Sequence, residues 1–128
     1  MILDSSAVIA ILLREAGADE LEAKVAAAPA LGIGAPTFVE TLMVLSSRFG
    51  PDAAGHLEGF LRRSEAVVVP FSEEHAREAA EAFARFGKGR HRAALNFGDC
   101  MSYAVAKLAG QRLLCTGEDF ARTDLPLA

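Results

Sequence analysis

Short apolar runs alternate along the chain with longer segments whose apolar residues recur every three to four positions. The short runs are typical of strands and lie at residues 1–3, 31–35, 66–71 and 112–116, with a weaker one at 125–128. The longer segments predict helices at residues 5–15, 17–28, 36–49, 51–64, 72–87 and 96–110. This alternation predicts one α/β domain over residues 1–128, with a mainly parallel sheet of four or five strands and helices on both faces.

The same pattern predicts which surfaces are buried. The helix over 36–49 carries apolar residues around nearly its whole circumference, so we expect it to be buried. The continuous apolar run at 66–71 is typical of the strands that form parallel sheets. The helix over 72–87 is expected to turn one stripe inward, made of Ala76, Ala79, Ala80 and Phe83.

Composition narrows the class of protein. With 128 residues, 52% of them hydrophobic, the chain can bury one core, but no apolar run approaches the roughly 20 residues of a membrane span. No basic segment precedes the first apolar helix, so a signal peptide is not expected. The only cysteines, Cys100 and Cys115, lack metal-binding spacing and suggest a reducing compartment. We therefore expect a cytoplasmic protein with no membrane contact.

Charge is distributed unevenly along the chain. The formal net charge of −4 argues against unspecific binding of nucleic acid. Between Glu81 and Asp99, however, there is no acid, while Lys88, Arg90 and Arg92 lie in that interval. Such a loop could guide a phosphate backbone toward an acidic centre, or it could simply be a solvated loop; the pattern leaves both open.

Two carboxylates in the first third of the chain stand at unusual positions. Asp4 follows the first strand directly, where open α/β sheets bind their ligands, although Asp is also a preferred helix cap. Glu40 lies one turn inside an apolar helix, where a carboxylate needs a cation or several donors. Pairing with Arg48, or simple stabilisation by the amino end of the helix, would also explain Glu40.

Two further acids occupy equivalent positions later in the chain. Asp99 lies in the first turn of a late helix, and Asp119 follows the last main strand. Because the carboxyl ends of parallel strands meet at one edge, we expect these two acids to converge with Asp4 and Glu40. Like charges so close need bound cations, and oxygen-only ligands suit Mg²⁺ or Mn²⁺ rather than zinc.

Carboxylate-held divalent ions are well suited to phosphodiester hydrolysis. With a basic loop directly before Asp99, the predicted substrate is a nucleic-acid backbone. One alternative is a Mg²⁺-binding phosphoacceptor or sensory α/β module without nuclease activity, but its expected lysine is poorly matched because Lys107 lies in mid-helix. Another is a binding protein that has lost its activity, against which the complete set of acids argues.

Four motifs together resemble the PIN domain, most closely the VapC toxins of bacterial type II toxin–antitoxin pairs. They are ILDSSA at 2–7, Glu40 after a strand and a proline, NFGDC at 96–100, and TGEDF at 116–120. The resemblance spans essentially the whole chain. It implies a Mg²⁺- or Mn²⁺-dependent endoribonuclease acting on RNA, held inactive by a VapB-type antitoxin and usually a homodimer.

The resemblance also implies roles for the acids. Asp4 and Asp99 match the principal metal ligands of the family, and Glu40 matches the third acid, which binds metal or positions water. The turn at 117–119 is shorter than in many relatives. Either Asp119 or Glu118 therefore takes the place of the fourth catalytic acid.

Three polar side chains near these acids complete the expected site. Ser6 and Thr116 match hydroxyl positions that line the site in the family. Asn96 is expected to fix the turn before Asp99. None of the three is assigned a catalytic role.

Overall fold

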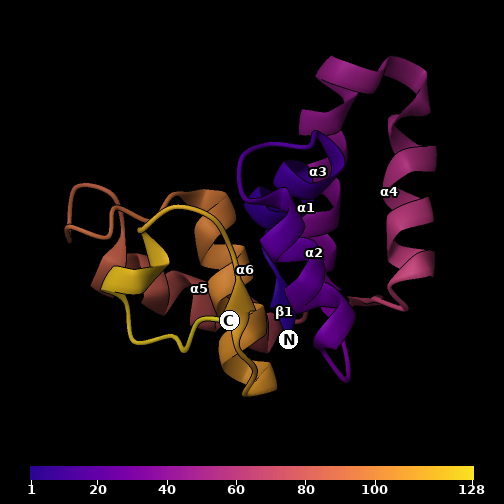
Figure 1. Ribbon diagram of the computed structural model, residues 1–128. Helices are drawn as coiled ribbons and strands as arrows, with labels where there is room; N and C mark the ends of the chain where they lie inside the picture. The colour runs from indigo at the N-terminus through magenta and orange to yellow at the C-terminus, as the bar shows by residue number, and fades with distance from the viewer.

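A four-stranded parallel sheet forms the centre of the computed structural model, which describes residues 1–128 (Figure 1). The strands are β1 (Ile2–Leu3), β2 (Gly32–Gly34), β3 (Val67–Val69) and β4 (Leu113–Leu114), in the order β3-β2-β1-β4 with every neighbouring pair parallel. The predicted strand at 125–128 is reduced to one parallel bridge, between Leu113 and Leu127. The predicted α/β fold with a parallel sheet is confirmed.

Six α-helices surround this sheet. They are α1 (Ser5–Leu12), α2 (Ala18–Ala27), α3 (Ala35–Phe49), α4 (Ala53–Arg63), α5 (Glu73–Phe86) and α6 (Phe97–Ala109), with short 3₁₀ turns at Gly50–Asp52 and Phe120–Arg122. None of these helices has the length and apolar character needed to cross a membrane. The helix positions agree with the sequence pattern to within a few residues.

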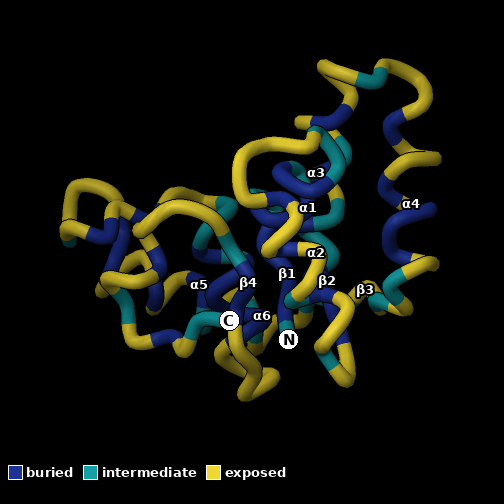
Figure 2. The backbone as a smooth tube through the Cα atoms, viewed as in Figure 1, coloured by how far each residue is buried: buried dark blue, intermediate teal, exposed yellow.

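The helices cover both faces of the sheet because successive strand residues point to opposite sides. Leu3, Ile33 and Leu114 pack into one core with residues of α1, α2, α3 and α4. Their neighbours Ile2 and Leu113 pack into a second core with residues of α5 and α6. Figure 2 shows β1 and β4 as buried, in dark blue, between these layers.

The apolar run at 66–71 forms a strand of the parallel sheet, as predicted, but this strand is not buried. Val67 and Val68 of β3 are 61% and 44% exposed. The reason is the strand order, which places β3 at the edge of the sheet, where it pairs only with β2. An edge strand can be as apolar in sequence as an interior one. The order of strands depends on contacts between segments far apart in the chain, so the local pattern does not reveal it.

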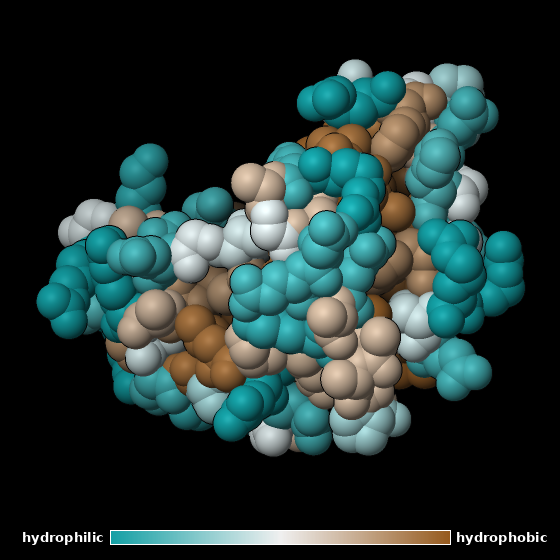
Figure 3. Space-filling view, in the orientation of Figure 1, coloured by the Kyte–Doolittle hydropathy of each residue, from teal (hydrophilic) through white to brown (hydrophobic).

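The expectation that α3 is buried all round is wrong. The helix packs against α1, α4 and α6 through one face, on which Thr37, Thr41 and Leu45 are buried. Val39 and Met43 on its opposite face are 52% and 69% exposed, and Val44, at the edge of the packed face, is 42% exposed. Figure 3 shows further hydrophobic side chains at the surface beside α4, between hydrophilic ones.

The inward stripe of α5 differs from the predicted one. Of the four predicted residues only Ala79 is buried, and it is joined by Ala82 and Phe86. Ala76, Ala80 and Phe83 are exposed. The helix is rotated because α6 packs along its length, and a helix of many alanines gives little preference for one rotation over another.

Asp124 holds the C-terminal segment against two helices. Its carboxylate accepts hydrogen bonds from the Tyr103 hydroxyl (2.6 Å) and the Lys107 ammonium (2.9 Å), and it pairs with Arg85 (3.3 Å). Burial alone would raise the pKa of the Asp124 carboxyl, but these hydrogen bonds and charges outweigh it and lower the pKa to about 2. The contacts connect the segment after β4 to α5 and α6.

Asp124→Asn is expected to destabilise the fold in a pH-dependent way. Because the folded-state pKa lies below the ordinary value of about 3.9, the stabilisation is present above about pH 4 and is lost as the pH falls toward 2. After allowance for solvent screening, the loss at neutral pH should be on the order of 1 kcal/mol. Urea unfolding of both proteins at about pH 7 and about pH 3 measures it.

The matched control is Asp52→Asn, because Asp52 is exposed and its side chain caps nothing. Asp52→Asn should leave the free energy of unfolding unchanged at either pH. An Asp124→Asn effect of equal size at both pH values would contradict the electrostatic account.

Candidate active site

Asp4 is a buried carboxylate at the junction of β1 and α1, only 3% exposed. Its Oδ2 accepts hydrogen bonds from the backbone N–H (3.1 Å) and the hydroxyl (2.6 Å) of Ser6, so Asp4 is the N-cap of α1. Its Oδ1 accepts a hydrogen bond from the Ser102 hydroxyl on α6 (2.6 Å). Capping and a chemical role are therefore compatible, because they use different oxygens.

Ser6 also connects Asp4 to the end of β4. The Ser6 hydroxyl oxygen accepts a hydrogen bond from the backbone N–H of Thr116 at 3.0 Å. The backbone N–H of Asp4 in turn donates to the carbonyl of Leu114 at 2.9 Å. Thr116 thus reaches the site through its backbone amide, while its side chain is exposed. These bonds hold the ends of β1 and β4 together at one edge of the sheet.

Asp99 and Asn96 form a capping box at the start of α6. The Asn96 N–H donates to Asp99 Oδ2 (3.0 Å), and the Asp99 N–H donates to Asn96 Oδ1 (2.9 Å). Burial raises the pKa of the Asp99 carboxyl to about 6, and the negative charges of Asp4, Asp119 and Glu40 act in the same direction. The structure therefore brings four acids from separated segments into one electrostatic neighbourhood.

Glu40 lies directly against the first turn of α6. A Cβ added at Gly98 would clash with the Glu40 carboxylate, whose Cδ would be 2.7 Å away. Arg48, the alternative partner considered above, forms no salt bridge with Glu40. The absence of a side chain at residue 98 is what allows the carboxylate to approach α6.

The two acids of the last turn are placed differently. Glu118 is exposed and pairs with Arg122 at 3.8 Å. Asp119 is also exposed, but its charge acts on Asp99 and on Cys115. Burial, with the charges of Asp4 and Asp99, raises the pKa of the Cys115 thiol to about 11, so this cysteine is not a nucleophile at neutral pH. This arrangement favours Asp119 over Glu118 as the fourth acid.

The chemistry of these side chains fits a hard divalent cation. No three His, Cys, Asp or Glu side chains converge into a complete ligand group. The available donors are carboxylate oxygens. Burial, together with the charges of Asp4, Asp119 and Glu40, raises the pKa of the Asp99 carboxyl, and no cationic side chain acts against them. Oxygen donors with excess negative charge suit Mg²⁺ or Mn²⁺ and do not favour zinc.

Two further residues of this site, Ser102 and Thr37, were not predicted from the sequence. Both are buried, at 0% and 1% exposure, and their hydroxyl oxygens lie 3.1 Å apart. The one available signal is spacing: Ser102 follows Asp99 by three residues and Thr37 precedes Glu40 by three, which places each pair on one helix face. Serine and threonine at such positions are too common for the spacing alone to identify them.

The basic loop directly precedes α6. It is closed at its base by a bridge between Gly87 and Leu95. The side chains of Lys88, Arg90 and Arg92 are exposed, and the Arg90 guanidinium lies over the Phe83 ring at 5.1 Å from its centroid. The structure shows no contact of these three side chains with the acids.

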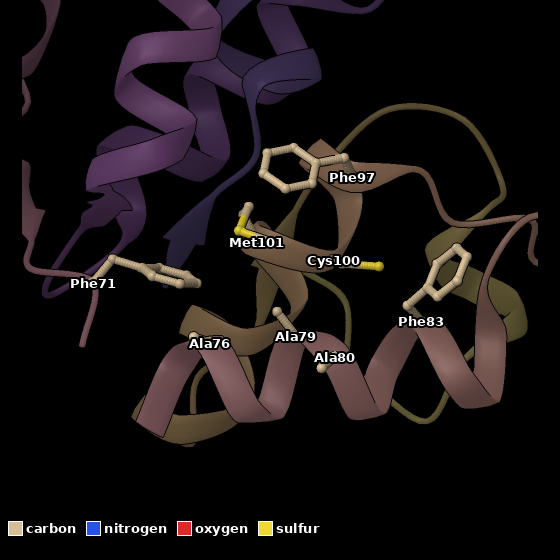
Figure 4. A pocket seen from close by; sticks show the side chains of 8 residues that line it. All are labelled: Phe71, Ala76, Ala79, Ala80, Phe83, Phe97, Cys100 and Met101. Carbon is tan, nitrogen blue, oxygen red and sulfur yellow. The ribbon is translucent and has the colours of Figure 1, made fainter. Parts of the chain in front are cut away.

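An apolar groove lies between α5 and the start of α6 (Figure 4). It has a volume of about 570 Å³ and is lined by Phe71, Ala76, Ala79, Ala80, Phe83, Phe97, Cys100 and Met101. Phe97, next to Gly98 in the chain, is 80% exposed. The exposed residues of α5 that do not face the core therefore line this groove.

A sequence model of the PIN domain matches residues 1–125. The ribonuclease VapC of Mycolicibacterium smegmatis is 44% identical over 98% of this chain and 97% of its own length. The ribonuclease VapC36 of Mycobacterium tuberculosis is 48% identical over 98% of this chain and 91% of its own length. The chain belongs to the PIN domain family. Among PIN domains, these relatives are ribonucleases of the VapC type.

Solved structures show the same fold. VapC20 of Mycobacterium tuberculosis, described as a toxin that cleaves the sarcin–ricin loop, superposes with a TM-score of 0.79 at 19% identity, covering 99% of this chain and 97% of that one. VapBC2 of Rickettsia felis, bound to a DNA fragment from its promoter, gives a TM-score of 0.75 at 18% identity, covering 99% and 96%. At these identities the likeness concerns the fold alone.

Gly98→Ala is expected to lower activity without destabilising the fold. The added methyl group must displace the flexible Glu40 carboxylate, while Ala is favoured over Gly within a helix by about 1 kcal/mol. We expect an RNA-cleavage rate at least about tenfold lower and an unchanged or higher Tm. The rate is measured on a labelled RNA with Mn²⁺, and the Tm by thermal unfolding.

Gly55→Ala is the matched control, since a Cβ at Gly55 on α4 meets nothing within 4 Å. It should leave cleavage unchanged. Native cleavage by Gly98→Ala would show that the position of the Glu40 carboxylate is unimportant.

Proposed function

We propose that this protein is a divalent-metal-dependent endoribonuclease toxin of the VapC type. The observation that carries the proposal is the placement of Asp4, Glu40 and Asp119 close enough to Asp99 for their negative charges to act on its carboxyl. The VapC ribonucleases that match almost the whole chain at 44% and 48% identity support it. The names of these relatives state a ribonuclease activity, and the acid cluster offers a chemical basis for the same activity in this chain.

In this proposal Asp4, Glu40 and Asp99 hold Mg²⁺ or Mn²⁺, and Asp119 completes the acidic site. The bound ion would supply charge neutralisation of the phosphodiester and a lowered pKa of the attacking water. Asp4 is held by hydrogen bonds on both oxygens, and Asp99 Oδ2 is held by the Asn96 N–H. The Glu40 carboxylate, free of any salt bridge, is available to orient the water and accept its proton.

The basic loop is proposed to bind the RNA backbone. Lys88, Arg90 and Arg92 are exposed and stand just before the helix that carries Asp99. Their positive charges would draw phosphates toward a site that is otherwise acidic. Since RNA is the substrate, the protein would act in the cytoplasm.

A VapB-type antitoxin and a second copy of the chain are the proposed protein partners. The Rickettsia felis neighbour is a VapBC complex, and another neighbour is described as a toxin–antitoxin complex from Klebsiella pneumoniae. The exposed apolar side chains of α3, which are Val39, Met43 and Val44, support burial against another chain. This surface supports a partner without identifying which one occupies it.

The positions of the basic side chains do not favour the phosphoacceptor alternative. Such a site requires a lysine close to the acids. Lys107 instead pairs with Asp124 at 2.9 Å. No basic side chain is among the groups that shift the pKa of Asp99.

Asp4→Asn and Asp99→Asn are each expected to reduce RNA cleavage at least about a hundredfold, since each removes a proposed metal ligand. EDTA should have the same effect on the native protein. Glu118→Gln is the control and should retain activity, because Glu118 pairs with Arg122. Cleavage that persists in EDTA or in both Asn variants would exclude the proposed function.

Asp99→Asn should also stabilise the metal-free protein. Because the folded-state pKa of about 6 lies above the ordinary value, native stability falls as the pH rises from about 4 to about 6. Above that pH the neutral variant should be more stable by on the order of 1 kcal/mol, a gain absent near pH 4. Unfolding in EDTA at both pH values measures it, and an Asn variant that is less stable at neutral pH would contradict the account.

Neutralising the loop by Lys88→Gln, Arg90→Gln and Arg92→Gln together should weaken RNA binding and reduce its salt dependence. Three lost phosphate contacts should lower the slope of log K against log salt by about 2. Mn²⁺ affinity should not change. The control replaces Arg48, Arg62 and Arg63, which are exposed on α3 and α4, and an equal slope for both triple variants would exclude the loop from RNA binding.

A further inference from the structure

Three buried polar side chains form a chain of hydrogen bonds from α3 through α6 to the end of β1. The Thr37 and Ser102 hydroxyl oxygens lie 3.1 Å apart, and Ser102 Oγ lies 2.6 Å from Asp4 Oδ1. The residues are 1%, 0% and 3% exposed. No buried side-chain nitrogen or oxygen atom of the protein lacks a hydrogen-bond partner.

The donors in this chain can be ordered from elementary chemistry. An ionised carboxylate only accepts hydrogen bonds, so Ser102 must use its single hydroxyl proton on Asp4. The Thr37 hydroxyl must then donate to the Ser102 oxygen. Thr41 does not compete, because its hydroxyl donates to the Thr37 carbonyl at 2.7 Å. The order is therefore Thr37 to Ser102 to Asp4, and each bond strengthens the next.

The hydrogen bonds also determine which part of the Asp4 carboxylate is free. A carboxylate has about four acceptor positions, two on each oxygen. Both positions on Oδ2 are used by Ser6, through its N–H and its hydroxyl. One position on Oδ1 is used by Ser102, which leaves one acceptor position on Oδ1.

We propose that Asp4 binds the metal ion through this one free position on Oδ1, and that Ser102 and Thr37 are positioning residues that hold Oδ1 for it. The proposal rests on the proposed metal-dependent function. Without the Ser102 hydroxyl, Oδ1 loses its only hydrogen bond and the carboxylate is held through Oδ2 alone. Thr37 contacts no acid and acts only by orienting Ser102.

A purely structural role, in which the two hydroxyls only join α3 to α6, makes a different prediction. It predicts a loss of stability without a specific loss of metal affinity. Thr41 provides the comparison because it is equally buried on α3 and its hydroxyl bonds only to backbone. Thr41→Val and Thr37→Val remove the same group from the same helix, and only the second is connected to Asp4.

The test measures Mn²⁺ binding by calorimetry and, separately, the Tm of the metal-free protein. Ser102→Ala should weaken Mn²⁺ binding about tenfold, in the range seen when a group that orients a ligand is lost, and Thr37→Val about threefold. In Ser102→Ala, adding Thr37→Val should cause no further loss. Thr37→Ser should keep native affinity, and in RNA cleavage the variants should change kcat with little change in KM.

Thr41→Val should lower the metal-free Tm and leave Mn²⁺ affinity unchanged. Native affinity in both Ser102→Ala and Thr37→Val, equal losses in Thr41→Val, or independent effects in the double variant would overturn the inference. If Ser102→Ala does not fold, the difference in Mn²⁺ affinity between Thr37→Val and Thr37→Ser tests the inference instead. Native protein that binds no Mn²⁺ would exclude the proposed function and this inference together, whereas native binding with unaffected variants excludes the inference alone.

Discussion

A buried carboxylate at the end of a central strand is the constraint on which the arrangement of this protein depends. Removing the charge of Asp4 from water costs several kcal/mol unless its oxygens are hydrogen-bonded. The donors come from Ser6 on α1 and Ser102 on α6, and Ser6 is itself connected to the end of β4. Burial of Asp4 therefore requires α1, α6 and β4 to meet at the end of β1, which is where the other acids are also found.

The acid cluster lowers the stability of the metal-free protein, but the proposed function needs its charge. The raised pKa of Asp99 means that its charge is unfavourable in the metal-free protein, and the charges of Asp4, Asp119 and Glu40 add to the effect. The fold tolerates this because two cores on either side of the sheet are well packed and because Asp124 secures the last segment. Sites of this kind commonly contradict local rules of stability because their charge is needed for chemistry.

Whereas the acid cluster places charge in partly buried positions, other parts of the surface expose large apolar side chains. Met43 on α3 and Phe97 at the start of α6 are 69% and 80% exposed, although their size and polarity are those of core residues. Exposed apolar patches on a folded chain commonly mark contacts with other molecules. They explain why hydrophobic content alone overestimated the burial of α3, since residues that bury against a partner follow the same pattern as residues that bury in the core.

From sequence alone, the alternation of elements determined an α/β domain with a parallel sheet, because hydrophobic periodicity is a local property. The same pattern placed Asp4, Glu40, Asp99 and Asp119 at strand ends and helix starts, and parallel topology then required them to share one edge. Only the tertiary structure decided that β3 is an edge strand, that α3 exposes Met43, and that α5 turns Phe86 rather than Phe83 inward. Strand order and helix rotation depend on contacts between distant segments. For the same reason Ser102 and Thr37 could not be found in advance: two ordinary hydroxyls 65 residues apart gain a role only when α3 and α6 pack together beside Asp4.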